Sequence, residues 1–124
     1  MASPPDMRDP RLTVPAGCDR TLPETASSLI SLVQAKCYGG TCHNSGSLPP
    51  MRTSSELLAL KNKVSSAELP YVTADDYDKS YLLYKLTGEQ SKVPKGNGGK
   101  MPGVGFLLDS EVCRFIRWVK HGAN

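Results

Sequence analysis

Two thiols and an imidazole lie close together in the run Cys37-Tyr38-Gly39-Gly40-Thr41-Cys42-His43. Sulfur and imidazole donors bind metals such as zinc, and a pair of thiols can also close a disulfide or form thioethers. His43 follows Cys42 directly, so its ring is held beside any group that the sulfurs hold. Two of the four residues between the cysteines are glycines, which tolerate positive φ and allow the spacer to bulge outward. This run is the first candidate site for chemistry.

The order of these residues resembles the haem attachment motif of c-type cytochromes, Cys-x-x-Cys-His, with two residues added between the cysteines. In that motif each thiol adds across one vinyl group of the haem, and the histidine ligates the iron from the proximal side. A four-residue spacer also occurs in some multihaem cytochromes. The resemblance implies one covalent haem c, attached through Cys37 and Cys42, with His43 as the proximal ligand.

The composition indicates one small domain with much irregular backbone. The chain has 124 residues, of which ten are proline and eleven are glycine. A chain of this length buries a modest fraction of its surface, so a prosthetic group in the core would stabilise it. The net charge of +3 is too small to indicate nucleic-acid binding. The lysines suit either docking of an acidic redox partner or simply a soluble surface.

The sequence gives three expectations about location and boundaries. No apolar run is long enough to cross a membrane, and the opening Met-Ala-Ser-Pro-Pro has no hydrophobic stretch, so we expect no signal peptide and a mature start. Four cysteines in a small domain favour an oxidising compartment. Residues 1–20 are rich in proline and charge without periodicity, so we predict a tail or linker there and one domain over residues 21–124.

Apolar periodicity and capping signals predict an all-α fold of three to five short helices. The first helix is predicted to begin near Thr21, where Thr21-Leu22-Pro23-Glu24 is a capping-box pattern. Its apolar stripe is predicted to contain Ala26, Leu29, Ile30, Val33 and Cys37. The stripe places Cys37 on the buried side of the last turn, which suits a thioether, a disulfide or a core thiol equally well.

Three further helices are predicted after the cysteine motif. A capping box at Thr53-Ser54-Ser55-Glu56 opens a short one, and residues 78–88 form another that ends at Gly88. The last runs over residues 109–121, with Asp109 as N-cap and Gly122 as its stop. The apolar sides are predicted to be Leu57, Leu58 and Leu60 for the short helix, and Leu108, Val112, Phe115, Ile116 and Val119 for the last.

Residues 89–105 have no periodicity, and Met101 is the residue that gives this loop a candidate function. A methionine thioether is a soft ligand, and histidine–methionine ligation raises the potential of haem iron towards electron transfer. Met51 follows His43 too closely to reach the opposite haem face easily, and the other methionines lie in the predicted tail. The alternatives are that Met101 fills a gap in the core, or that His121 is the distal ligand instead.

Together these pieces resemble a small single-haem cytochrome c domain of class I, and also cytochrome c domains of planctomycete and other environmental bacteria. The resemblance covers residues 24–123 and rests on the helix that ends in the motif, the helix up to Gly88, the Lys100-Met101-Pro102 loop and the closing helix with Trp118. It implies a cytochrome c fold and a periplasmic or otherwise extracytoplasmic single-electron carrier. It also implies redox protein partners, and we expect a monomer without enzymatic activity. The implied axial ligands are His43 and Met101.

The same resemblance implies a use for the two remaining cysteines. The first and last helices pack together in this family, so we predict a Cys18–Cys113 disulfide that ties the N-terminal tail to the last helix; the alternative is two unpaired thiols. Trp118 is predicted to be a core anchor or a contact at the haem edge. Two haem-free alternatives remain open. One is a structural or interaction module with a Cys37–Cys42 disulfide, and the other is zinc bound by the motif and a fourth ligand.

Overall fold

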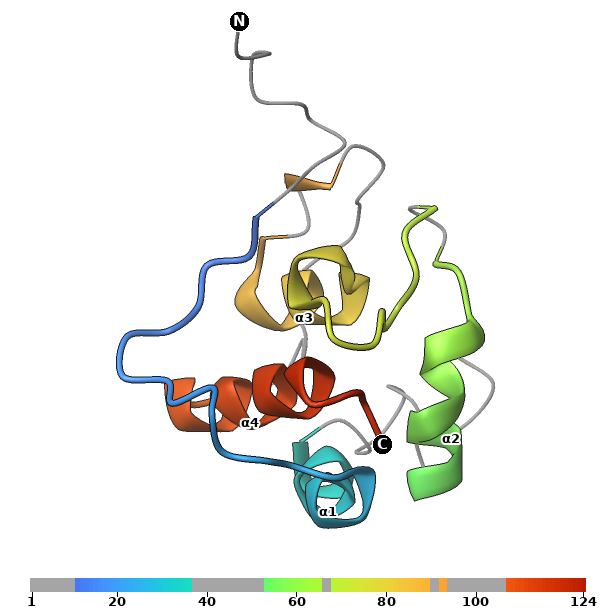
Figure 1. Ribbon diagram of the computed structural model, residues 1–124, viewed down its shortest axis with the longest axis horizontal. Coiled ribbons are helices and arrows are strands. Elements are labelled where there is room, and N and C mark those ends of the chain that lie inside the picture. The colour runs from blue at the N-terminus through green and yellow to red at the C-terminus, as the bar shows by residue number, and fades with distance from the viewer. Residues whose placement is uncertain (1–10, 37–52, 66–67, 90–91, 94–106) are drawn as a thin grey trace, which may run out of the picture.

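In the described part of the chain, the first and third α-helices pack against the C-terminal helix, and the second packs against the first (Figure 1). A computed structural model describes residues 11–36, 53–65, 68–89, 92–93 and 107–124. Over these ranges the chain forms helices and no strand, and one isolated antiparallel bridge joins Val64 to Pro70. The predicted all-α class is therefore confirmed for the part of the chain that is described.

Four α-helices and two 3₁₀ turns make up the described structure. The α-helices are α1 (Ala26–Lys36), α2 (Ser54–Ala59), α3 (Tyr81–Thr87) and α4 (Asp109–Lys120). The 3₁₀ turns are η1 (Leu60–Asn62), which follows α2 directly, and η2 (Tyr77–Lys79), which precedes α3. Figure 1 shows α4 between α3 and α1, with α2 to one side. Contacts run from α4 to α1, α3 and η2, and from α1 to α2.

The apolar face of α4 forms the centre of the core. Phe115, Ile116, Trp118 and Val119 are fully buried, and Val112 is nearly so. The periodicity of the sequence predicted four of these five. The burial of Trp118 agrees with its predicted role as a core anchor, and the alternative of a contact at the haem edge stays a prediction. Leu108 was also predicted on this face but is 54 % exposed, because it lies one residue before the helix in an extended conformation.

The first helix begins five residues later than predicted. Thr25 Oγ1 accepts a hydrogen bond from the Ser28 N–H at 3.2 Å, and Ser28 Oγ accepts one from the Thr25 N–H at 3.1 Å, so these two residues cap α1 reciprocally. Thr21 does not cap a helix because its hydroxyl and N–H both bond Asp19 Oδ1. The capping-box prediction at Thr21 is therefore wrong.

Ser80 divides the predicted third helix into η2 and α3. Its hydroxyl is fully buried, accepts from the Thr73 N–H at 2.9 Å and donates to the Asp76 carbonyl at 2.9 Å. These bonds hold Ser80 in an extended conformation that interrupts the helix. The predicted stop at Gly88 is confirmed, because Gly88 ends α3 with φ of 77° in the left-handed region.

The remaining helix ends follow the sequence signals in part. Thr53 is the N-cap of α2, as predicted, and its hydroxyl accepts from the Glu56 N–H at 3.2 Å. Asp109 is not the N-cap of α4, because the helix begins at that residue and the Glu111 carboxylate accepts from the N–H of Leu108 at 2.8 Å. α4 ends at Lys120, and Gly122 follows with φ of 96°, close to the predicted stop.

Residues 11–20 lie along α4 and η2, and we call this segment the N-terminal strap. Leu12 is buried in the core, and its N–H donates to Asp78 Oδ1 at 2.8 Å. Thr13 bonds the Glu89 carboxylate through both its N–H, at 3.0 Å, and its hydroxyl, at 2.6 Å. This half of the predicted tail therefore packs against the described part of residues 21–124.

We expect Ser80→Ala to lower the free energy of unfolding by about 1–3 kcal/mol, because it leaves the Thr73 N–H and the Asp76 carbonyl without their buried partner. Urea unfolding at neutral pH followed by circular dichroism measures the change. Ser31→Ala is the matched control, because Ser31 is exposed on α1. Equal unfolding midpoints for the two variants would contradict the role given to Ser80.

Candidate functional site

The four residues predicted to hold a cofactor lie outside the described part of the chain. These are Cys37, Cys42, His43 and Met101. The structure does describe the element that leads into the motif, since α1 ends at Lys36, directly before Cys37. The position of α1 therefore fixes where the motif begins.

One side of α1 is anchored in the core. Leu29 and Val33 are fully buried, and Ala26 and Leu32 are nearly so. Three members of the predicted stripe are confirmed by this burial, whereas Ile30 is partly buried at the edge of the core. Leu29 and Val33 are four residues apart, and Cys37 is the next residue at that spacing in the sequence.

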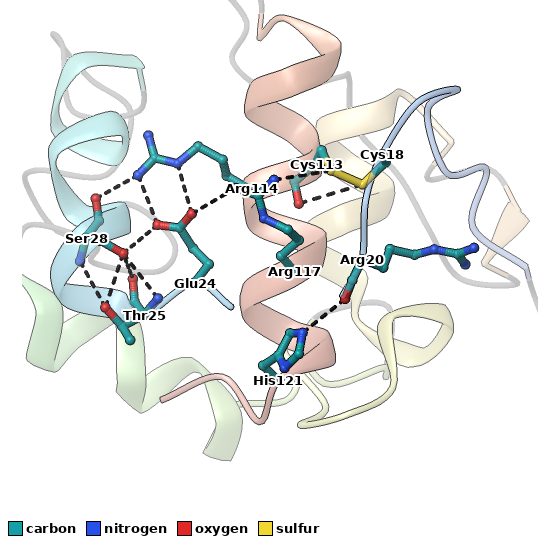
Figure 2. Close-up of polar contacts among 9 residues, drawn as sticks. All are labelled: Cys18, Arg20, Glu24, Thr25, Ser28, Cys113, Arg114, Arg117 and His121. Atoms are coloured by element: carbon teal, nitrogen blue, oxygen red, sulfur yellow. Dashed lines mark hydrogen bonds and ion pairs between the residues drawn. A yellow bond between two sulfur atoms is a disulfide. The ribbon is translucent and has the colours of Figure 1, made fainter. Parts of the chain in front are cut away.

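An ion-pair network fixes the start of α1 against α4 (Figure 2). The Glu24 carboxylate, whose side chain is 6 % exposed, accepts from Arg114 Nε at 3.1 Å and Arg114 Nη2 at 3.0 Å. Arg117 Nη2 lies 3.3 Å from the same carboxylate. Arg114 Nη2 also donates to the Ser28 carbonyl at 2.8 Å, so this guanidinium bridges the carboxylate and the first turn of α1.

The network keeps Glu24 ionised. Burial by itself raises the pKa of this carboxyl, but hydrogen bonds from Arg114, Ser28 and Arg117 outweigh burial, so its pKa lies below the usual glutamate value of 4.5. The same hydrogen bonding to Glu24 raises the pKa of Arg114. The two charges therefore stabilise each other at neutral pH.

A disulfide joins the N-terminal strap to α4. Cys18 and Cys113 are bonded, with 5.5 Å between their Cα atoms and 95 residues between them in sequence. This confirms the predicted pair over the alternative of two unpaired thiols. In Figure 2 the ion-pair network lies toward α1 and the disulfide lies toward the strap, and Arg117 of α4 contacts both Glu24 and Cys113.

His121, the competing candidate for the distal ligand, lies at the C-terminal end of α4. Its ring is exposed, and Nε2 lies 3.0 Å from the carbonyl oxygen of Arg20 (Figure 2). This contact engages His121 with the strap. Met101, the favoured distal ligand, lies outside the described ranges. The choice between Met101 and His121 therefore stays a prediction.

Trp118 leaves a polar atom in the core without a partner among the described residues. Its side chain is fully buried, and no hydrogen-bond acceptor within those residues meets Nε1. A buried indole N–H usually finds an acceptor. The carboxylates of a haem are acceptors of this kind. In the sequence, the motif carries the two thiols that would form the thioethers of a c-type haem, and His43 and Met101 carry the imidazole and the thioether that would ligate its iron. The residues present therefore fit this group.

The described residues contain no cluster of metal-binding side chains, and the comparisons with known proteins find no relative. Within residues 11–36, 53–65, 68–89, 92–93 and 107–124, no group of three His, Cys, Asp or Glu side chains is placed to bind a metal ion. No helix in those ranges is long and apolar enough to cross a membrane. Comparison with protein-family models, curated proteins and solved structures gives no match.

Sequence reasoning missed the Glu24 network. Glu24 was interpreted as the last residue of a capping box, whereas it pairs with two arginines some ninety positions away. The available signal was the pair Arg114 and Arg117, which lie three residues apart on α4 and therefore point to one side of it. The spacing of these arginines did not indicate which acidic residue they would pair with.

We expect Glu24→Gln to lower the free energy of unfolding by about 1–2 kcal/mol at pH 7, because both arginines lose their charged partner. The pKa of Glu24 is lower in the folded chain than in the unfolded chain. Its contribution is therefore complete above the usual value of 4.5 and is lost as the pH falls through the folded-state pKa. The stabilities of the wild type and Glu24→Gln should therefore converge at low pH, and denaturant unfolding at a series of acidic pH values measures the difference between them.

Glu111→Gln is the control for charge, because it removes one negative charge from α4 but keeps an acceptor for the Leu108 N–H. A wild-type advantage over Glu24→Gln that stays constant down to the lowest pH would contradict the ionic account.

We expect the double variant Cys18→Ser, Cys113→Ser to be less stable than the oxidised wild type by about 4 kcal/mol, because the long closed loop no longer restricts the unfolded chain. Urea unfolding in a non-reducing buffer measures the difference. In a buffer that fully reduces the wild type, the two proteins should unfold at similar midpoints. Equal stability without reductant would show that the disulfide contributes nothing.

Proposed function

We propose that this chain is a single-electron carrier domain with a cytochrome c fold and one covalent haem c. Cys37 and Cys42 would form the thioethers, His43 would be the proximal ligand and Met101 the distal ligand. When bound, the haem supplies a reversible one-electron iron couple. Two axial side chains leave no iron position for a substrate, so the proposed role is transfer and not catalysis.

The observation that carries this proposal is the anchoring of α1. A helix with one buried face ends at the residue before a Cys-x4-Cys-His motif, and the first turn of that helix is fixed to α4 by the Glu24 network. The contact between α1 and α4 is the arrangement that the resemblance to class I cytochromes implied. The unpartnered Nε1 of Trp118 adds an interior donor for which the described residues supply no acceptor.

The scaffold suits a carrier because it holds the helix that precedes the motif. α1 is held by its apolar face, by the ion pairs of Glu24 and, through the strap, by the Cys18–Cys113 disulfide. A site that moves little between its oxidised and reduced states transfers an electron with little reorganisation. In this proposal Cys37, Cys42, His43 and Met101 would bind the group, and the described contacts hold the helix that precedes the motif.

We further propose that the domain works outside the cytoplasm with protein redox partners, as a monomer. The disulfide supports this location, because such bonds form and persist in oxidising compartments. The net charge of +3 favours an acidic partner surface.

We expect protein produced in a host competent in cytochrome maturation to be red, with a sharp Soret band and a mass increase of one covalent haem. The oxidised spectrum should contain the weak far-red band that reports sulfur–iron ligation. Met101→Ala should lose this band and keep the covalent haem, whereas Met51→Ala, the matched control, should keep both. Absorption spectra of the oxidised and reduced proteins and intact-mass measurements test these outcomes.

A far-red band that survives in Met101→Ala but disappears in another methionine variant would reassign the distal ligand. A colourless protein in which Cys37 and Cys42 are bridged would overturn the proposal. The haem-free structural module would then be the better account of the fold.

A further inference from the structure

The Cys18–Cys113 disulfide lies at the wall of a surface pocket of about 310 Å³. Six side chains that define its character are Cys18, Asp19, Leu22, Asp109, Cys113 and Arg117. The pocket lies between the strap and α4 and is open to solvent. A small molecule that enters it therefore meets both sulfur-bearing residues.

The two cysteines differ in access. Cys113 lies within α4 and is 4 % exposed, whereas Cys18 lies on the strap and is partly exposed. A thiolate attacks a disulfide along the axis of the sulfur–sulfur bond, on the side opposite the departing sulfur. Because Cys18 is the more exposed of the two cysteines, an attacker that comes from the pocket reaches its sulfur more readily.

The two cysteines also differ in their electrostatic surroundings. Arg117 Nη1 lies 3.9 Å from Cys113 Sγ, and Arg117 Nε is buried with no partner among the described residues. A guanidinium beside a sulfur stabilises the thiolate over the thiol and so makes that sulfur the better leaving group. Cys113 is therefore both the shielded sulfur and the one prepared to depart.

We propose that Cys18–Cys113 is a thiol–disulfide exchange site at which an incoming thiolate attacks Cys18 Sγ and Cys113 Sγ leaves as a thiolate beside Arg117. With a dithiol as reductant, the first thiolate forms a mixed disulfide with Cys18. The second thiolate then attacks the reagent's own sulfur and releases Cys18. The dithiol is oxidised to its cyclic disulfide by two electrons, and its two protons are transferred to the two cysteines.

The rim of the pocket selects the charge of the thiol. Asp19 and Asp109 both line it, and hydrogen bonds from Thr21 lower the pKa of Asp19, so this carboxylate stays charged. Two carboxylates repel an anionic thiol and attract a cationic one. We therefore assign the site to neutral or cationic thiols.

Exchange would loosen the strap without releasing it. Leu12 and Thr13 keep their hydrogen bonds to Asp78 and Glu89 when the disulfide opens. Residues 14–20 lose their covalent attachment, and the contact of the Arg20 carbonyl with His121 remains. The inference does not rest on the haem proposal, because it concerns neither Cys37 nor Cys42.

The first experiment maps the reaction on the folded, matured protein. The protein is treated at pH 8 with cysteamine, a cationic monothiol, and new thiols are alkylated after an acid quench. Peptide mass spectrometry should find cysteamine on Cys18 and the alkyl group on Cys113. The reaction should also be at least about tenfold faster than global unfolding under the same conditions, because the site is open in the native state.

Finding the mixed disulfide on Cys113 would overturn the proposed direction of attack. Reaction only at the rate of global unfolding would overturn the site itself. Cysteamine should react faster than 3-mercaptopropionate relative to their rates with a small disulfide, and 1 M salt should reduce this preference. Equal relative rates would overturn the role given to the acidic rim.

The second experiment tests Arg117. Arg117→Gln should slow exchange by about threefold to tenfold, because Cys113 leaves without its cation. Arg114→Gln is the matched control: it also removes an arginine that pairs with Glu24, but no contact joins it to the sulfur. Equal rates for the two variants would overturn the role of Arg117.

A separate measurement tests the loosening of the strap. After reduction of the disulfide, amide hydrogen exchange should become faster in residues 14–20 alone.

Discussion

Burial of one face of α4 is the constraint on which the rest of the described structure depends. Each large apolar side chain on that face contributes about 1.5–3 kcal/mol when it is removed from water, and α4 supplies Phe115, Ile116 and Trp118 fully buried. α1 and α3 both pack against this helix, whereas α2 contacts α1. Anything that displaces α4 therefore displaces the helix that leads into the cysteine motif.

Polar and covalent links then fix elements that a small apolar core leaves free to slide. Glu24 joins the start of α1 to α4 through two arginines, and Cys18 joins the strap to the same helix. Both links join residues that are far apart in the sequence, so each of them restricts many arrangements of the chain. Hydrogen bonds between residues close in sequence fix shorter segments. The side chain of Ser80, for example, fixes the junction between η2 and α3.

The sequence predicted those features that depend on local periodicity and left out those that depend on distant partners. The buried face of α4, the stop at Gly88 and the cap at Thr53 are local, and the structure agrees with all three. The start of α1 was missed because Asp19 and two arginines engage the residues that resembled a capping box. The disulfide was reached only through the family resemblance. The motif cysteines, His43 and Met101 lie outside the described residues, so at the site itself the sequence remains the guide.

The disulfide closes a ring that contains every residue proposed to hold the haem, since Cys37, Cys42, His43 and Met101 all lie between Cys18 and Cys113 in the chain. During synthesis the motif emerges well before Cys113, so the ring can close only after the whole segment between the two cysteines has been made. Once the ring is closed, a single backbone nick inside it leaves the protein in one covalent piece.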